Sequence, residues 1–176
     1  PLTIHTPLNK VPGAINGAAI IETAEIILES LARDFGFAAP RLAIAGLNPH
    51  AGEDGMLGAE EKEIIAPAVA ALKAKGHRVS GPLSADTLFH DEARRSYDAA
   101  LTMYHDQGLI PIKTLSFWDG VNVTLGLPIV RTSPDHGTAF DIAGTGKADV
   151  RSMIAAIKMA AVMANARASA TSKSVR

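Results

Sequence analysis

Apolar and polar residues follow two patterns along the chain, one with helical spacing and one of short continuous apolar runs. Helical spacing predicts helices over about 13–35, about 59–75, 91–97, 109–117 and 149–167. Short apolar runs bounded by turn residues predict strands over 41–46, 78–83, 98–104, 121–125 and 128–132. Strands that alternate with helices predict an α/β fold, with a mostly parallel sheet flanked by helices on both faces.

Glycine, proline and polar residues predict where these elements end. Gly36 and Gly76 are expected to close the first two long helices. Pro67 predicts a kink or a split in the second, because its ring cannot continue the hydrogen-bond ladder. Asp149 is expected to cap the last helix, and the polar tail over 168–176 is expected to fray.

Two histidines follow predicted strands at the edge where an α/β sheet binds ligands. His50 comes after the strand at 42–46, and His105 after the strand at 98–104. If these strands are parallel neighbours, both imidazoles face one crevice beyond the carboxyl ends of the sheet. Imidazole suits Zn²⁺ and similar divalent ions, but a catalytic ion needs about three protein ligands. By themselves, two loop histidines so far apart are weak evidence for a metal site.

Composition narrows the classes of function. The 176 residues are 47% hydrophobic and 20% charged, with a net charge of −1, which gives no reason to expect nucleic acid or an anionic membrane as partner. No apolar run reaches the roughly 18 residues that a bilayer requires. The absence of cysteine excludes disulfides, thiolate metal sites and a cysteine nucleophile, and it fits a cytoplasmic protein.

Other polar positions allow both a structural and a chemical interpretation. The glycines of 52–58 do not have the spacing of a dinucleotide fingerprint, and 144–147 departs from a phosphate loop, so both segments are predicted to be turns. Arg131 lies near a strand end, where a guanidinium can bind phosphate through two hydrogen bonds, although a charge at the rim of the fold is the commoner explanation. Asp86 is similarly a turn or cap residue first and a catalytic carboxylate second.

Five motifs occur in an order that resembles one known family. They are Gly46-Leu-Asn-Pro-His-Ala-Gly52, Gly81-Pro-Leu-Ser-Ala-Asp-Thr-Leu-Phe89, Met103-Tyr-His-Asp-Gln-Gly108, Gly120-Val-Asn-Val-Thr-Leu-Gly-Leu-Pro128 and Arg131-Thr-Ser-Pro-Asp-His-Gly-Thr-Ala139. Together they resemble the 4-hydroxythreonine-4-phosphate dehydrogenases of pyridoxine biosynthesis along nearly the whole chain. The resemblance implies a fold similar to isocitrate and isopropylmalate dehydrogenases, with two α/β domains, and a homodimer whose active sites use residues of both subunits.

The resemblance also implies a site and a reaction. His50 and His105 match two of the family's three metal-ligating histidines, and the ion would be Zn²⁺, or Mg²⁺, Co²⁺ or Mn²⁺. Lys113, Asn122 and Arg131 match substrate-binding positions. NAD would oxidise a phosphorylated hydroxy acid, 4-phosphooxy-threonine, whose 3-oxo product loses CO₂ to give 3-amino-2-oxopropyl phosphate. Asp86 matches an acidic position near the metal and is a candidate base, as is a metal-bound water.

The family's chain is about twice as long, so residues 1–176 are interpreted as the carboxy-terminal portion of a two-domain enzyme whose amino-terminal portion is absent. The third histidine ligand is then expected upstream of Pro1, His5-Thr6 is not taken for a site pair, and the fragment alone is expected to be inactive. Two alternatives remain open. One is a related dehydrogenase of 4-phosphothreonate or 4-phosphoerythronate, and the other is a non-catalytic metal-binding or interaction domain.

Overall fold

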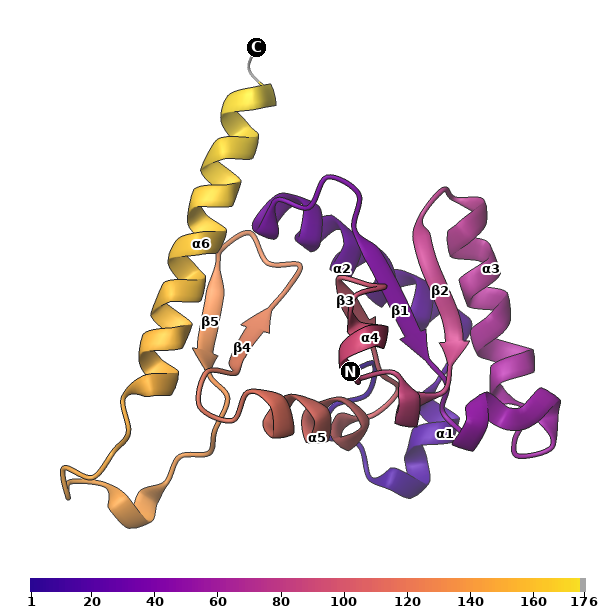
Figure 1. Cartoon of the computed structure of the whole chain (residues 1–176), viewed down its shortest axis with the longest axis horizontal. Coiled ribbons are helices and arrows are strands. Elements are labelled where there is room, and N and C mark those ends of the chain that lie inside the picture. Colours follow the sequence, from indigo (N-terminus) through magenta and orange to yellow (C-terminus); the bar gives the residue numbers. More distant parts are fainter. Residues whose placement is uncertain (175–176) are drawn as a thin grey trace.

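The computed structural model describes residues 1–174, with side chains for residues 1–170. Figure 1 shows a parallel sheet with its helices on one side of the molecule, a hairpin and a long helix on the other, and α5 between them. The sheet has the order β2-β1-β3, with β1 (Arg41–Ala45) in the centre, flanked by β2 (Arg78–Leu83) and β3 (Ala99–Leu101). Both pairings of β1 are parallel, which confirms the predicted α/β fold for this part of the chain.

Two long helical segments cover one face of the parallel sheet. α2 (Gly17–Phe35) begins where the side chain of Asn16 accepts a hydrogen bond from the amide of Ala19 at 2.9 Å, and it ends at Gly36 with φ of 76°. The predicted helix therefore ends where expected but begins later. The residues before it form two separate short turns, η1 (Leu8–Lys10) and α1 (Val11–Ala14).

The second helical segment is continuous but changes from π-helix to α-helix one residue before Pro67. A π-helical turn, η3 (Glu61–Ile65), leads into α3 (Ala66–Ala74), and Pro67 lies in the first turn of α3, where its missing N–H costs little. Side chains of α2 and α3 pack with the central strands into the main core, which includes Ile20, Leu72 and Ile44.

The opposite face of the sheet has a thinner cover. Leu88 packs against Ala43 and Ala45 of β1. The segment that provides this cover contains η4 (Ala85–Thr87) and the one-turn helix α4 (Asp91–Arg94), which is shorter than the predicted 91–97.

The last two strands form a separate antiparallel hairpin, so the expectation of one mostly parallel sheet is wrong for this part of the chain. β4 (Val121–Thr124) pairs with β5 (Arg131–Pro134), and α6 (Arg151–Ser174) packs along the hairpin. Asp149 lies one position before the predicted cap site, since Val150 O accepts from the amide of Ile154, but its carboxylate accepts from the amide of Arg151, the first residue of α6, at 2.9 Å. The tail predicted to fray is helical as far as Ser174, and residues 175–176 lie outside the described part.

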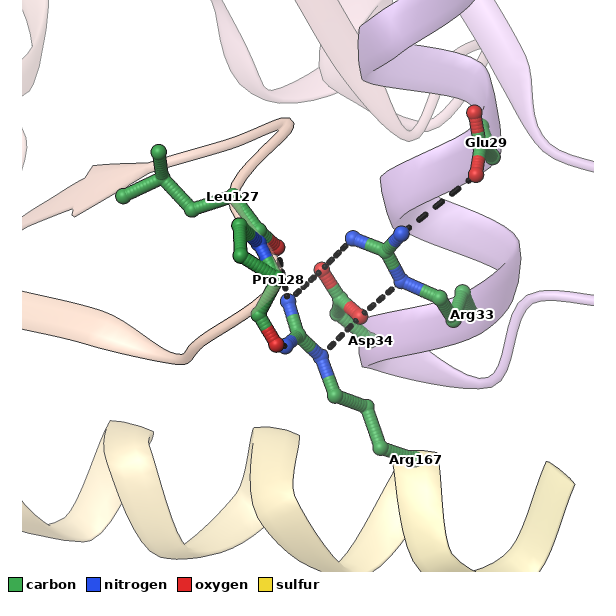
Figure 2. A network of polar contacts seen from close by, with 6 residues as sticks. All are labelled: Glu29, Arg33, Asp34, Leu127, Pro128 and Arg167. Atoms are coloured by element: carbon green, nitrogen blue, oxygen red, sulfur yellow. Dashed lines mark hydrogen bonds and ion pairs between the residues drawn. The ribbon is translucent and has the colours of Figure 1, made fainter. Parts of the chain in front are cut away.

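A buried carboxylate connects α6 to the rest of the fold (Figure 2). Asp34 at the end of α2 is fully buried and lies between two guanidinium groups. Arg33 and Arg167 each approach it with Nε at 2.7 Å from Oδ1, and each adds a second bond to Oδ2. Arg167 also donates to the main-chain oxygens of Leu127 and Pro128 in the hairpin turn, so one ion-pair network joins α2, α6 and the β4–β5 connection.

No single helix within residues 1–174 has the length and apolar character needed to cross a membrane. Two helical segments, Leu8–Ala14 and Gly17–Phe35, meet that criterion only jointly, across a bend of 91°.

Candidate functional site

The two histidines chosen from the sequence follow adjacent parallel strands. β1 and β3 pair in register from Leu42 with Ala99 to Ile44 with Leu101. His50 lies in the turn η2 (Pro49–Gly55) beyond β1, and His105 is the first residue of α5 (His105–Leu115) beyond β3. The condition set by the sequence is therefore met, since both histidines lie beyond the carboxyl ends of neighbouring strands.

The turn that carries His50 has an uncommon backbone. Five successive residues, His50 to Asp54, have φ between 44° and 80°. This is the left-handed region, which residues other than glycine rarely adopt. A buried carboxylate offsets the cost of this backbone conformation. Glu61 accepts hydrogen bonds from the amides of Leu47 and Asn48, both at 2.7 Å, and from the Asn48 side chain at 2.9 Å. Burial alone would raise the pKa of Glu61, but these hydrogen bonds outweigh it and hold the pKa below its ordinary value.

A glycine in this turn is required by close approach as well as by conformation. Gly52 has φ of 80°, and a Cβ on it would lie 2.6 Å from the Glu61 carboxylate. The motif Gly46-Leu-Asn-Pro-His-Ala-Gly52 thus builds a tight turn around Glu61, with His50 exposed on its outer side.

The imidazole of His105 has a neighbouring carboxylate and a neighbouring imidazole. Its Nδ1 lies 2.7 Å from Asp106 Oδ1, and when Nδ1 carries the proton it donates to Asp106 and leaves Nε2 free for a ligand. The ring of His5 lies 5.9 Å from that of His105, centre to centre. His5 was not selected from the sequence, which placed the third histidine upstream of the chain.

Residues next to His5 explain its position. The amide of Leu2 donates to Thr102 O at 2.7 Å, and the amide of Thr3 donates to Met103 O at 3.2 Å. The first residues therefore run alongside the end of β3, which brings His5 to the same edge as His105.

A cavity of about 700 Å³ opens next to this histidine pair. Lys113 and Asn122, both predicted to bind substrate, line it together with His5 and His105. Lys113 is paired there with Asp135, Nζ to Oδ2 at 2.9 Å, and also contacts the main-chain oxygen of Asp135. Asp135 was not predicted as a site residue, although it lies in the last of the five motifs.

His50 and Asp86 line a different cavity, of about 320 Å³. Ser84 Oγ donates to Asp86 at 2.6 Å, and this bond, with a smaller contribution from His50, holds the pKa of Asp86 below its ordinary value. Tyr104 lines this cavity and also a third one that His5 and His105 share. The predicted residues thus form two groups with Tyr104 between them.

Arg131 does not line these cavities, but it lies on the same hairpin as Asn122, which lines the cavity beside His105. Its guanidinium donates to Thr124 Oγ1 at 2.7 Å. In the hairpin Asn122 faces Ser133 and Thr124 faces Arg131, so Asn122 and Arg131 lie on the same face of the two-stranded sheet. Arg131 therefore lies on the hairpin face that carries Asn122, two residues along β5 from Ser133, the residue that pairs with Asn122.

Another cavity, of about 550 Å³, adjoins the one at His105. Both are lined by Lys113, Asp135, His136 and Gly137, so the two cavities lie next to each other. The second is lined by aromatic and small residues, among them Trp118 and the turn at 144–147 that the sequence analysis rejected as a phosphate loop. Sequence reasoning named no residues for a nucleotide cofactor, because neither glycine pattern fits a known fingerprint.

The imidazoles are suitable donors for a divalent ion of borderline softness. Within the described residues, however, no three histidine or carboxylate side chains gather closely enough to hold an ion.

Comparison with known proteins gives consistent matches. The family model described as "Pyridoxal phosphate biosynthetic protein PdxA" matches residues 1–160. A 4-hydroxythreonine-4-phosphate dehydrogenase of Caulobacter vibrioides is 63% identical over 94% of this chain and 50% of its own length. A crystal structure of the Klebsiella pneumoniae enzyme of that name superposes with a TM-score of 0.82 at 49% identity, covering 94% of this chain and 49% of that one.

A more distant solved structure has another substrate in its name. It is a terephthalate 1,2-cis-dihydrodiol dehydrogenase of Burkholderia xenovorans, 31% identical with a TM-score of 0.73, covering 91% of this chain and 50% of that chain. In these matches the chain spans about half the length of its relatives. Since the family model covers most of the sequence, the chain belongs to the PdxA family of pyridoxal phosphate biosynthetic proteins.

Proposed function

We propose that the protein oxidises 4-phosphooxy-threonine with NAD and decarboxylates it to 3-amino-2-oxopropyl phosphate, a step of pyridoxal phosphate biosynthesis. The observation that carries this proposal is the 63% identity to a relative that bears the name of this enzyme. Because the chain covers about half of that relative, the activity is proposed for the complete protein.

Lys113, Asn122 and Arg131 are proposed to bind the anionic ends of the substrate. Lys113 and Asn122 line the cavity beside His105, and Arg131 shares the hairpin face of Asn122. Residues two positions apart on one face are separated by about 7 Å, so a substrate that carries both a carboxylate and a phosphate could reach both groups. Asp135 holds Lys113 in place, and its charge disfavours an anion unless that ion displaces it.

The adjoining cavity is proposed to hold the nicotinamide cofactor. Trp118 and Phe117 offer aromatic surface, and Gly144 and Gly146 allow close approach of a ligand to the backbone. Because this cavity shares four lining residues with the one at His105, a cofactor bound in it would lie next to the substrate, as hydride transfer requires.

His50 and His105 are proposed as metal ligands, and His5 joins them as a further candidate because of its contact with His105. When bound, NAD would accept the hydride, and a divalent ion such as Zn²⁺, Mg²⁺, Co²⁺ or Mn²⁺ would polarise the hydroxyl and the resulting carbonyl. The donors that one chain does not supply would come from a second subunit or from further parts of the protein.

Asp86 is proposed as the acidic residue of the site. The hydrogen bond from Ser84 holds its pKa below the ordinary value of an aspartate, so its carboxylate is a weaker base than usual. A base with a lowered pKa removes a hydroxyl proton poorly unless that proton is itself made more acidic. Asp86 is therefore better suited to accept a hydrogen bond near His50 than to remove a proton by itself.

A homodimer with shared active sites is proposed as the assembly. Within the described residues, α6 exposes Met153, Ile154, Ile157 and Val162. A helix that exposes this much apolar surface is typical of a protein interface. A second subunit could cover it and close the site.

Assays on the full-length protein can test this function. We expect NADH formation and CO₂ release with 4-phosphooxy-threonine, and a kcat/KM at least tenfold lower with 4-phosphothreonate or 4-phosphoerythronate, because a pocket built for an amino group leaves polar atoms unpaired with the analogue. A preference for a sugar acid would favour the related dehydrogenase, a reading that the dihydrodiol dehydrogenase of the same fold keeps open. No reduction of NAD with any of the three would favour the non-catalytic alternative.

A further inference from the structure

One buried side chain connects the ends of the strands that lead to the candidate metal ligands. Gln107 is 8% exposed. Its Oε1 accepts from the amide of Met103 at 2.7 Å, and its Nε2 donates to Gly46 O at 2.8 Å. Met103 lies two residues before His105, and Gly46 lies four residues before His50.

The connection extends beyond Gln107 on both sides. On one side, Met103 O accepts from the hydroxyl of Thr3 at 2.8 Å, and Thr3 lies two residues before His5. On the other, the amide of Gly46 donates to Leu83 O at 2.7 Å, three residues before Asp86.

These bonds form one row across four neighbouring segments, which we call the crossbar: Thr3, Met103, Gln107, Gly46 and Leu83. Every segment of the crossbar leads within a few residues to a candidate site residue. The remaining links are bonds of main-chain groups or of one hydroxyl, and Gln107 is the only crossbar residue whose side chain bonds to two other crossbar residues, Met103 in its own segment and Gly46 in the next.

Glutamine is suited to this place by its chemistry. Its amide offers an acceptor and a donor on neighbouring atoms, whereas an ionised glutamate only accepts and a methionine does neither. Both main-chain partners belong to buried residues, so each would lose a hydrogen bond where water cannot replace it.

We propose that Gln107 is a positioning residue, which sets the spacing between the His50 turn and the histidine pair His5 and His105, and through it the affinity for a divalent ion. The proposal rests on the metal-dependent function proposed above. Gln107 does not need to touch the ion. Its effect passes through Gly46 and Met103, in the way that outer groups around metal sites orient the ligands.

The test uses Co²⁺ as the probe and the full-length protein. We expect Gln107→Met, which keeps the length of the side chain without its hydrogen bonds, to weaken Co²⁺ binding 10- to 100-fold and to shift the visible absorption bands of the bound ion. Thr3→Val removes one bond of the crossbar and keeps the shape of the side chain. It should fold readily and weaken binding by a smaller factor.

Tyr97→Phe is the matched control, because it removes a single partly buried hydrogen bond, from Tyr97 Oη to Leu88 O at 2.9 Å, that is not part of the crossbar. All variants should lose some thermal stability, but only those of the crossbar should change Co²⁺ affinity and spectrum. Unchanged affinity and bands in both Gln107→Met and Thr3→Val, or in Thr3→Val if the other does not fold, would overturn the proposal. Failure of the unaltered protein to bind Co²⁺ would overturn the metal-dependent function and this inference together.

Discussion

Replacing Asp34 with asparagine tests whether the buried ion-pair network holds α6 on the fold. The carboxylate is fully buried and receives two bonds from each of Arg33 and Arg167 (Figure 2). Asparagine keeps the shape but loses the charge, and it turns an NH₂ group toward guanidinium donors. We therefore expect the guanidinium groups of both arginines to lose most of the attraction that offsets the cost of burying their charge.

Two considerations give the magnitude. The pairing lowers the pKa of Asp34 from 3.8 to about 2, against the cost of burial. That difference corresponds to about 2 kcal/mol of stability, an upper value because the Arg33 side chain is 35% exposed and water screens its share. Removing one partner of a buried pair typically costs roughly 3–5 kcal/mol. We expect Asp34→Asn to lower the free energy of unfolding at pH 7 by about 2–4 kcal/mol.

The dependence on pH has a defined sign. Because the pKa is lowered in the folded state, the contribution of Asp34 is complete above its unfolded value of 3.8 and is lost as the pH falls toward 2. In urea titrations the gap between the original protein and Asp34→Asn should stay constant from pH 7 to about 5 and shrink below about pH 4.

Asp149→Asn is the matched control. The pKa of Asp149 is also lowered to about 2, by Arg151, but both side chains are exposed and the pair lies at the start of α6. Its loss should change the unfolding free energy far less. Equal effects of the two substitutions would refute the argument that burial makes the Asp34 network stabilising.

Four further substitutions test the site and its supports. Asp106→Asn should weaken Co²⁺ binding about tenfold in a titration, because the His105 imidazole loses the group that orients it. Lys113→Met should lower kcat/KM for the phosphorylated substrate by about 10- to 100-fold in steady-state assays, the loss of one charge-assisted hydrogen bond. Gly52→Ala should lower the unfolding free energy by about 1–3 kcal/mol in urea, because its φ is 80° and a Cβ would lie 2.6 Å from a carboxylate oxygen. Trp118→Ala should raise the KM for NAD and leave the KM for the acid substrate nearly unchanged.

The sequence predicted where the strands lie, and which strands the candidate site residues follow, better than it predicted the ends of the helices. α5 begins at His105, four residues before the predicted start, because the sequence pattern predicts a loop over residues 105–108 after the strand. A Cβ at Gly108 would lie 2.8 Å from the hydroxyl of Thr102, so this glycine allows close packing rather than ending a helix. Such a contact depends on the tertiary fold, which periodicity along the chain does not report.

His5 shows the limit of sequence patterns for the site. A single histidine among turn residues has no periodicity, and its partner His105 is 100 residues away. Only the pairing of Leu2 and Thr3 with the segment after β3 brings the two rings together. The left-handed turn of His50 is similar, because its conformation depends on the buried carboxylate of Glu61 rather than on its own residues.

The distribution of exposure fits the proposal that a second polypeptide or a further part of the protein covers the candidate site. His5, His50, Asp86 and Asn122 are all exposed, although catalysis of hydride transfer benefits from a site that excludes water. The main core and most of the crossbar (Thr3, Met103, Gln107 and Gly46) are buried, whereas the side chains of the candidate site are exposed. A rearrangement within the chain would have to break that buried support, whereas docking of another surface would cover the exposed residues and leave it intact. Docking is therefore the less costly way to assemble the proposed active site.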